Sequence, residues 1–314
     1  MMASVAVASR SFSKHPLLRA ELTARYPDAA FNELGRALAG EDLIAFLRGH
    51  DRAIIALERI DARILDALPA LRVISKYGVG LDMLDLVAMN ARSVRLGWSG
   101  GVNKRSVAEL TIAAAIQLLH RAAEASADVR AGQWRQWSGR QLTGKSFGII
   151  GCGHVGKDVA VLARAFDCSV LACDLLDFPE FYSAHGVRPV DLDTLLRTAD
   201  VVTLHVPLDA STHRLINRDR LNLMKRGSVV LNFARGGIID EAALVEALRS
   251  GAIAGAAVDV LEHEPPIDRA LIDLPNVLAT PHIGGSTEEA VIAMGRAAIA
   301  GLEAARLPSE LGLT

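Results

Sequence analysis

The sequence has few aromatic residues, few cysteines and almost no excess of charge of either sign. Aromatic side chains make up only 4% of the 314 residues, whereas hydrophobic residues of all kinds reach 51%. Small aliphatic residues therefore supply most of the core, as is usual for α/β proteins with short buried strands. A hydrophobic share this large excludes a disordered chain, and the length predicts about two domains.

Three further absences exclude classes of function. The net charge is −2, so the chain as a whole presents no basic field to a nucleic acid. No uncharged apolar run approaches the ~20 residues that span a bilayer. Cys152, Cys168 and Cys173 are odd in number and lack metal-type spacing, so neither a disulfide framework nor a metal site is indicated. We therefore expect a reduced, cytoplasmic protein.

Short apolar runs alternate with helix-like segments almost from end to end. The expected strands are Val5–Ala8, Ala53–Leu57, Leu71–Ser75, Val94–Leu96, Ser146–Ile150, Ser169–Cys173, Val201–Leu204, Val229–Asn232, Ile253–Val258 and Val277–Thr280. The expected helices are Pro16–Arg25, Asp61–Leu68, Asp82–Asn90, Val155–Phe166, Thr287–Arg306 and one long helix from about Ser106 to Ala131, with Asn103 or Ser106 as N-cap and Gly132 as its stop. This alternation predicts parallel sheets covered by helices on both faces.

Residues 151–156 form the pattern G-x-G-x-x-G between an expected strand and an expected helix. Gly151 would permit a tight turn, Gly153 would let a pyrophosphate approach the backbone, and Gly156 would let the helix pack on the strand. Asp174 ends the next strand, about 20 residues further on, where the dinucleotide fingerprint places its ribose-binding acid. Its charge would repel a 2′-phosphate, which favours NAD over NADP, unless Asp174 is simply a turn residue.

Three features of the last third carry groups that bind or move charge. Arg235 follows an expected strand, an acidic stretch runs from Asp259 to Glu264, and His282 stands between a proline and two glycines. A guanidinium at the carboxyl end of a parallel strand faces the ligand crevice and can bind a carboxylate bidentately. Taken singly, these features are more often a solvated arginine, a solvated acidic turn and a structural histidine.

Together the motifs resemble the D-isomer-specific 2-hydroxyacid dehydrogenase family, especially its phosphoglycerate dehydrogenase-like branch. The resemblance extends over nearly the whole chain, in the stretches Ile74–Asp82, Asn103–Leu110, Gly148–Gly156, Val202–Pro207, Asn232–Asp240, Ala256–Pro265 and Pro281–Thr287. It implies that Arg235, Glu264 and His282 are catalytic. His282 would be the acid–base, Glu264 would fix its tautomer and stabilise the imidazolium, and Arg235 would bind the 2-keto acid.

The resemblance also implies contacts with cofactor and substrate. The cofactor positions are Gly151, Gly153, His154, Val155, Gly156, Asp174, Pro207, Phe233, Ala234, Arg235, Asp259, His282 and Gly285. Asp259 would face the nicotinamide amide. The substrate positions are Val79, Gly80, Asn103, Arg235 and His282.

The fold implied by the resemblance is α/β, with two doubly wound parallel-sheet domains and a cleft between them. Residues 100–285 would form the Rossmann NAD-binding domain, and residues 1–99 with 286–314 would form a flavodoxin-like substrate domain. The resemblance implies a homodimer, in which the long helix takes part, and a short form without a regulatory domain.

The implied reaction transfers a hydride between NAD and a 2-keto or 2-hydroxy acid, and 3-phosphoglycerate is one candidate substrate. Hydroxypyruvate, glyoxylate, another small 2-hydroxy acid or a sugar acid are alternatives, and an NAD(H)-sensing scaffold of the corepressor type is an alternative of another class. The stretch 96–101 departs from the family pattern, so the substrate is open. The basic residues Arg59, Lys76, Lys104, Arg105 and Arg140 form either a phosphate site or a solvated surface.

Overall fold

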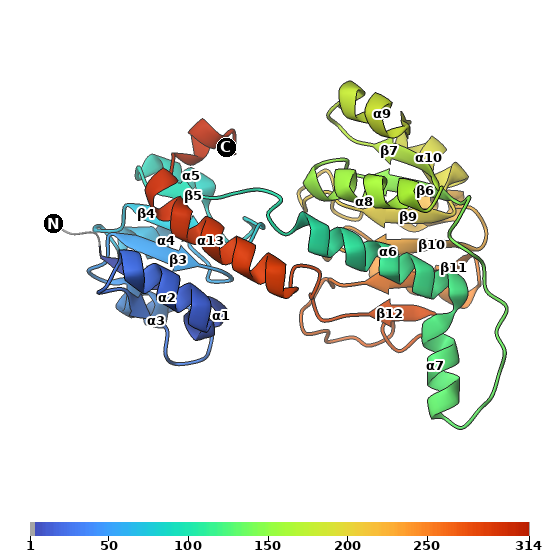
Figure 1. Ribbon diagram of the computed structural model, residues 1–314, viewed down its shortest axis with the longest axis horizontal. Helices are drawn as coiled ribbons and strands as arrows, with labels where there is room; N and C mark the ends of the chain where they lie inside the picture. The colour runs from blue at the N-terminus through green and yellow to red at the C-terminus, as the bar shows by residue number, and fades with distance from the viewer. Residues whose placement is uncertain (1–3, 314) are drawn as a thin grey trace. The chain divides into compact units, whose positions relative to one another are not determined.

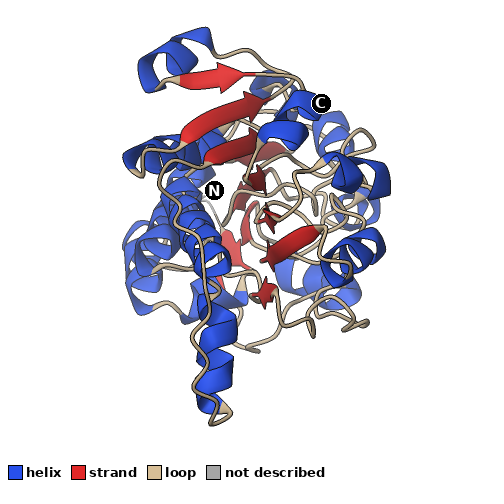
Figure 2. Ribbon diagram, turned by 90° about the vertical axis from the view of Figure 1, so that its right-hand side faces the viewer, coloured by secondary structure: helices blue, strands red, loops and turns tan. Residues whose placement is uncertain are grey.

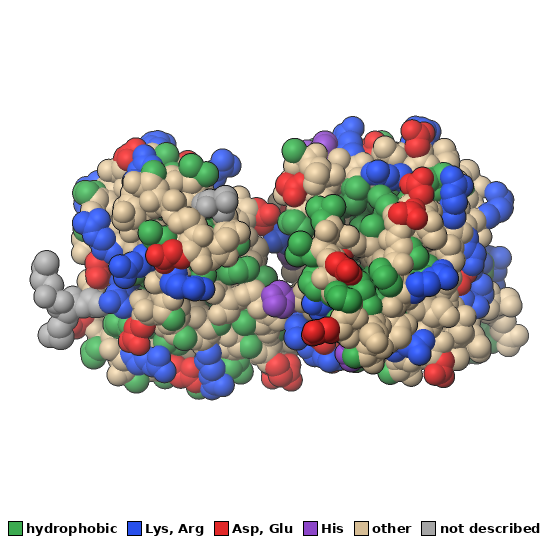
Figure 3. All heavy atoms as spheres, turned by 90° about the horizontal axis from the view of Figure 1, so that it is seen from above, with side chains coloured by type: hydrophobic (Ala, Val, Ile, Leu, Met, Phe, Trp, Pro, Cys, Tyr) green, Lys and Arg blue, Asp and Glu red, His purple; other side chains and the backbone are tan. Residues whose placement is uncertain are grey.

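The computed structural model describes residues 4–313, which divide into two compact units (Figure 1). Unit 1 consists of the residues up to Asn103 together with those from Glu288 onward, and unit 2 is Lys104–Thr287. None of the described helices is long and apolar enough to cross a membrane. On the face drawn in Figure 3, basic and acidic side chains are interspersed over the surface of each unit.

Unit 1 contains a five-stranded parallel sheet of order β2-β1-β3-β4-β5, the flavodoxin-like order. Its strands are β1 (Val5–Val7), β2 (Ala30–Phe31), β3 (Arg52–Ile55), β4 (Val73–Lys76) and β5 (Arg95–Gly97). Its helices are α1 (Arg10–Lys14), α2 (Pro16–Arg25), α3 (Gly40–Leu47), α4 (Ala62–Asp66), α5 (Leu86–Ala91), α13 (Glu288–Ala304) and the 3₁₀ helix η1 (Pro308–Leu311).

Alternating side chains of these strands enter two separate cores. Ala53 and Ile55 pack with the helices α3 to α5, whereas Ile54 packs on the opposite face with α2 and α13. The C-terminal helix α13 lies directly on the sheet. A Cβ atom at Gly97 would come within 2.3 Å of the Gly301 carbonyl oxygen, so the absence of side chains allows this approach.

Unit 2 contains a seven-stranded parallel sheet of order β12-β11-β10-β9-β6-β7-β8, which is the Rossmann order with one strand added. Its strands are β6 (Ser146–Ile150), β7 (Ser169–Cys173), β8 (Val187–Pro189), β9 (Val201–Leu204), β10 (Ser228–Asn232), β11 (Ile253–Val258) and β12 (Val277–Ala279). Its helices are α6 (Lys104–His120), α7 (Ala122–Arg130), α8 (His154–Ala165), α9 (Pro179–His185), α10 (Leu192–Thr198), α11 (Arg218–Leu223) and α12 (Glu241–Arg249).

Helices cover both faces of this sheet, as Figure 2 shows. Phe147 and Ile149 of β6 enter the core beneath α6 and α8, whereas Ile150 enters the core beneath α10 and α12. Strands buried on both faces have no polar side to expose, which explains why they read as continuous apolar runs. The expected fold class, with two doubly wound parallel sheets, is confirmed.

The expected long helix is wrong as a single element, because α6 ends at His120 and α7 begins at Ala122. Between them Arg121 has a left-handed backbone with φ of +58°. Its guanidinium binds both carboxylate oxygens of Glu124, at 2.8 and 2.7 Å, and lies over the Trp137 ring. These contacts stabilise a break for which the sequence offers neither glycine nor proline.

The predicted helix stop is confirmed, and the structure separates the two candidates for the N-cap. Gly132 follows the end of α7 with a positive φ of +77°, as a helix stop requires. Of the two N-cap candidates, Asn103 directly precedes α6, which begins at Lys104, whereas Ser106 lies inside the helix. The short edge strands β2 and β8 were not expected from the sequence.

Candidate dinucleotide and catalytic site

The strand ends of unit 2 bring the predicted site residues to one edge of the sheet. Ile150 pairs with both Cys173 and Leu204, so the segments after β6, β7 and β9 start side by side. Asn232, Val258 and Ala279 are likewise register partners at the ends of β10, β11 and β12. The glycine turn, Asp174, Arg235, Glu264 and His282 all follow these strand ends. Ligands of doubly wound proteins bind at this carboxyl edge.

The glycine turn leads directly from β6 into α8. Gly151 has φ of +92°, and a Cβ there would lie 2.6 Å from the His205 carbonyl oxygen. A Cβ at Gly156 would lie 2.1 Å from the Gly151 carbonyl oxygen, so only glycine lets the helix approach the turn this closely. By contrast, a Cβ at Gly153 would have no heavy atom within 4 Å. The backbone is therefore open at the position where the fingerprint places a pyrophosphate.

The start of α8 and the carboxylate of Asp174 fit the two ends of an adenosine diphosphate moiety. Gly153 is the N-cap of α8 and offers no side-chain acceptor, so the N–H groups of His154 and Val155 stay available to phosphate oxygens. Asp174 accepts hydrogen bonds from the N–H groups of Cys152, at 2.5 Å, and Leu176, at 2.9 Å. Each carboxylate oxygen retains a further acceptor position, which suits a ribose hydroxyl.

Burial sets the protonation of the groups beneath this turn. It raises the pKa of the Cys152 thiol to about 11, and the nearby Asp174 carboxylate adds to the effect. Burial also lowers the pKa of His205, whose Nε2 atom lies 3.0 Å from the Thr203 hydroxyl, to about 3. Cys152 is fully buried, in agreement with the prediction that it acts as a small hydrophobic residue.

Arg235 is presented by a short turn after β10. The buried Asn232 side chain donates to the Arg235 carbonyl oxygen at 2.8 Å and accepts from the Ala234 N–H at 3.1 Å. A Cβ at Gly236 would come within 1.9 Å of the Leu261 carbonyl oxygen, so the turn packs against the segment that follows β11. The structure thus brings the arginine turn into contact with the acidic loop.

Glu264 and His282 form the pair that the resemblance implies. Oε2 of Glu264 lies 2.9 Å from Nδ1 of His282, and its Oε1 accepts from the Leu261 N–H at 3.2 Å. The side chains are 40% and 49% exposed, so solutes can reach the pair. Because Nδ1 is engaged by the carboxylate, Nε2 is the ring atom that remains for proton exchange with a substrate.

Asp259 organises the loop that carries His282. Its carboxylate is buried and accepts from the Thr280 hydroxyl at 2.6 Å, the Ile283 N–H at 2.8 Å and the Gly284 N–H at 2.7 Å. His282 has a left-handed backbone, with φ of +55°, which a residue with a side chain adopts only when its surroundings enforce it. This loop-building role of Asp259 was not anticipated, because its partners follow it by more than twenty residues.

The other expected contacts are distributed over both units. Phe233 and Ala234 lie in the arginine turn, Pro207 follows β9 and Gly285 follows the His282 loop. Val79 and Gly80 lie in unit 1, in the loop after β4, and Asn103 is the last residue before unit 2. The Val79 carbonyl oxygen accepts from the Trp98 indole N–H at 2.9 Å. Among the described residues, neither the Val79 nor the Gly80 N–H has a protein acceptor.

Three of the basic residues considered for a phosphate site have partners within their own units. Lys76 is 5% exposed, and its ammonium donates to the Ala56 carbonyl oxygen at 2.5 Å. Arg105 pairs with Asp158 of α8 at 3.0 Å, on the side of the glycine turn. Arg140 instead donates to the Gly227 carbonyl oxygen, just before β10 begins. Arg105 and Arg140 thus lie toward opposite ends of the sheet in unit 2.

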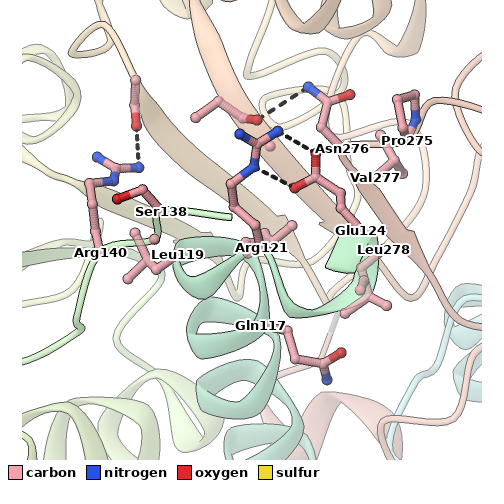
Figure 4. Close-up of a pocket in the computed structure, with 16 residues that line it drawn as sticks. Gln117, Leu119, Arg121, Glu124, Ser138, Arg140, Pro275, Asn276, Val277 and Leu278 are labelled. Atoms are coloured by element: carbon pink, nitrogen blue, oxygen red, sulfur yellow. Dashed lines mark hydrogen bonds and ion pairs between the residues drawn. The ribbon is translucent and has the colours of Figure 1, made fainter. Parts of the chain in front are cut away.

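A cavity of about 330 Å³ also lies away from the predicted catalytic residues (Figure 4). It is bordered by the end of α6, by Arg121, by Glu124 at the start of α7, and by Arg140 and Asn276. Gly227, Gly255 and Val277 place it at the amino ends of β10 to β12. This position is opposite to the edge where doubly wound proteins bind their ligands.

The strand order of unit 2, its open glycine turn and the acid that ends β7 define a dinucleotide-binding protein of the doubly wound class. A model of the D-isomer specific 2-hydroxyacid dehydrogenase family, NAD binding domain, matches residues 112–284, which is more than half of the chain. The chain belongs to this family, and unit 2 contains its NAD-binding domain. NAD is the cofactor that this domain binds.

Individual relatives agree with this assignment. The chain is 39% identical to a D-3-phosphoglycerate dehydrogenase from Archaeoglobus fulgidus over 84% of its own length and 51% of that relative. It is 38% identical to a glyoxylate reductase from Thermofilum pendens, over 80% of the chain and 76% of that relative. The chain thus spans about half the length of the phosphoglycerate dehydrogenases that it matches.

A solved structure from Polaromonas resembles nearly the whole fold. It is a putative D-isomer specific 2-hydroxyacid dehydrogenase with a TM-score of 0.88 and 30% identity, and the match covers 97% of this chain and 96% of the other. The likeness therefore includes both units and not the NAD-binding domain alone.

Proposed function

We propose that the chain is an NAD-dependent D-2-hydroxyacid dehydrogenase that interconverts a 2-keto acid and its 2-hydroxy acid. The observation that carries this proposal is the 2.9 Å contact between Glu264 and His282 at the edge of the dinucleotide-binding sheet. The relatives are named D-3-phosphoglycerate dehydrogenase and glyoxylate reductase, and both names denote reactions of this class. The substrate is a small 2-keto acid, and phosphohydroxypyruvate is one candidate.

In this mechanism the nicotinamide, when bound, supplies the hydride for reduction and accepts it in oxidation. Arg235 binds the carboxylate of the keto acid and polarises its carbonyl group, because the planar guanidinium can donate at once to a carboxylate oxygen and to the carbonyl oxygen. His282 donates a proton from Nε2 to the substrate oxygen, while Glu264 keeps Nδ1 engaged and stabilises the positive ring. The remaining cofactor and substrate positions from the sequence stay predictions.

Oxidation of NADH by a panel of keto acids tests this function. Phosphohydroxypyruvate, hydroxypyruvate, glyoxylate and pyruvate are offered in turn, and absorbance at the NADH band is followed. We expect turnover with at least one of them, and a loss on the order of 10²–10⁴-fold in a His282→Ala protein that still binds NADH. NADH binding without turnover, together with NADH-dependent capture of partner peptides, would instead support the corepressor-like scaffold.

We also propose that two copies of the chain associate through α7 and the segment that returns from it. None of the α7 residues is buried, and Trp134 in the following loop is 85% exposed. In Figures 1 and 2 both segments extend away from the body of unit 2. Exposed apolar side chains on such an arm indicate a surface that another molecule covers. We further propose a cytoplasmic location, consistent with three free thiols.

Sedimentation velocity tests the dimer. Val129→Asp places a charge on the arm at a side chain that is 52% exposed, and we expect this variant to sediment as a monomer. Val87→Asp, at a 71% exposed position of α5 in unit 1, is the matched control and should leave the dimer intact. A Val129→Asp protein that stays dimeric would exclude this surface.

A further inference from the structure

The first turn of α6 is bonded to the loop that carries His282. The Ser106 hydroxyl donates to the Gly284 carbonyl oxygen at 2.5 Å, and Ser106 is 7% exposed. Both residues belong to unit 2, although 178 positions separate them in the sequence. The hydroxyl therefore serves a distant loop and not the end of its own helix.

Further hydrogen bonds connect Gly284 to the backbone of His282. The Gly284 N–H donates to Oδ2 of the buried Asp259 at 2.7 Å, and the Ile283 N–H donates to Oδ1 at 2.8 Å. The Asp259 carbonyl oxygen in turn accepts from the His282 N–H at 2.9 Å. Ser106 thus anchors one end of a continuous set of hydrogen bonds that fixes the residues on both sides of His282.

These hydrogen bonds hold His282 in an unusual backbone conformation. His282 has φ of +55°, in the region that side-chain-bearing residues rarely adopt. There is little room for the loop to relax, because a Cβ at Gly284 would lie 3.0 Å from Oδ2 of Asp259 and 3.5 Å from Val107. The helix that carries Ser106 is seventeen residues long and packs against the core of unit 2, so it is a firm support.

We propose that Ser106 is a positioning residue for His282: its hydroxyl, through Gly284 and Asp259, holds the imidazole in the orientation in which Glu264 engages Nδ1. The inference rests on the proposed function only in so far as His282 is the acid–base. Reaction rates respond steeply to such placement, since a displacement of about 1 Å can cost on the order of 10²-fold. Loss of one bond from this set leaves the others, so we expect a smaller effect.

The variant Ser106→Ala is compared with Thr111→Val on the same helix. The Thr111 hydroxyl is also buried but donates to the Val107 carbonyl oxygen within α6, at 2.8 Å, so its loss does not reach the His282 loop. We expect kcat to fall about tenfold in Ser106→Ala, with NADH affinity unchanged, and to stay at the parent value in Thr111→Val. Ser106→Cys, which retains the volume but is a weak donor, should behave like Ser106→Ala and serves if the alanine variant does not fold.

A spectroscopic measurement tests the same inference without turnover. In protein labelled with ¹³C-histidine, the ring signal of His282 is assigned by its absence in His282→Ala. We expect the signal in Ser106→Ala to move toward its position in Glu264→Gln, where the carboxylate has been removed, and to stay in place in Thr111→Val. A folded Ser106 variant with an unmoved signal and parental kcat would overturn the inference. A parent protein that reduces no keto acid would overturn the proposed function alone, since the His282 signal can still be compared.

Discussion

Nδ1 of His282 and Oε2 of Glu264 lie 2.9 Å apart, although the two residues follow different strands of the sheet. The other oxygen of Glu264 is held by the Leu261 N–H, so the carboxylate itself has a defined orientation. In the proposed reaction, this contact leaves Nε2 of His282 as the ring nitrogen that exchanges a proton with the substrate.

The first prediction concerns the charge of Glu264. Glu264→Gln retains an acceptor for His282 but loses the charge that stabilises the imidazolium, so we expect kcat to fall by roughly 10–100-fold. Glu262→Gln changes an exposed carboxylate two residues earlier and should leave kcat nearly unchanged. Steady-state kinetics with the best keto acid measures both. Equal rates for the two variants would show that the charge of Glu264 has no part in the reaction.

The second prediction concerns cofactor choice. Asp174→Ala removes the negative charge that would repel a 2′-phosphate, so we expect the preference for NADH over NADPH to weaken. The N–H groups of Cys152 and Leu176 also lose their acceptor, which should cost about 1–3 kcal/mol of the free energy of unfolding. The ratio of kcat/KM for the two cofactors and urea unfolding measure these effects. Asp177→Ala, an exposed change in the same loop, is the control. A parent protein that prefers NADPH would refute the argument.

The third prediction is a pH dependence of stability. Burial lowers the pKa of His205 to about 3. Between its ordinary value of about 6.5 and 3, the unfolded chain binds a proton that the folded chain does not. The free energy of unfolding should therefore fall as the pH falls through this window, by at most about 1.4 kcal/mol per pH unit. His205→Gln should flatten this slope in urea unfolding from pH 4 to 7, and His263→Gln, at an exposed position, should not. Identical slopes in both variants would contradict the assignment.

The fourth prediction is that the cysteines are unreactive in the folded protein. Burial raises the pKa of all three thiols, to about 11 for Cys152. At pH 8 about one Cys152 in a thousand would be a thiolate, the form that reacts. We expect slow modification by iodoacetamide in the native state and rapid modification of all three thiols in urea. Cys173→Ser removes the one partly exposed thiol and controls for it. Fast native modification in this variant would mean that the buried thiols are accessible.

The strands with strong local hydrophobic patterns were those whose bounds could be predicted from the sequence. The expected bounds of Ser146–Ile150, Ser169–Cys173 and Ile253–Val258 agree with those of β6, β7 and β11, because these strands are apolar runs between turn residues. The edge strand β8 has the exposed Arg188 and a proline, so it lacks such a run. The break at Arg121 depends on Glu124 and Trp137, which a helix pattern cannot reveal.

The site could be predicted as far as its motifs extend. Arg235, Glu264 and His282 were singled out by the resemblance of their motifs to the family, since each feature alone favours a solvated or structural residue, and their roles remain predictions. The bonds of Asp259 and Ser106 connect residues between about 21 and 178 positions apart. Such bonds depend on how distant loops meet, and no local pattern of a single sequence contains that information.

The two units have separate hydrophobic cores, so one unit can be exchanged for that of a relative while the other is kept. A chimaera that keeps residues 104–287 of this chain retains the glycine turn and Arg235, together with the contact between Glu264 and His282. The segments before and after it can then be exchanged for those of a relative with another substrate. Under the proposed function, any change in substrate preference of such a chimaera would come from the exchanged segments, while the contact between Glu264 and His282 would be retained.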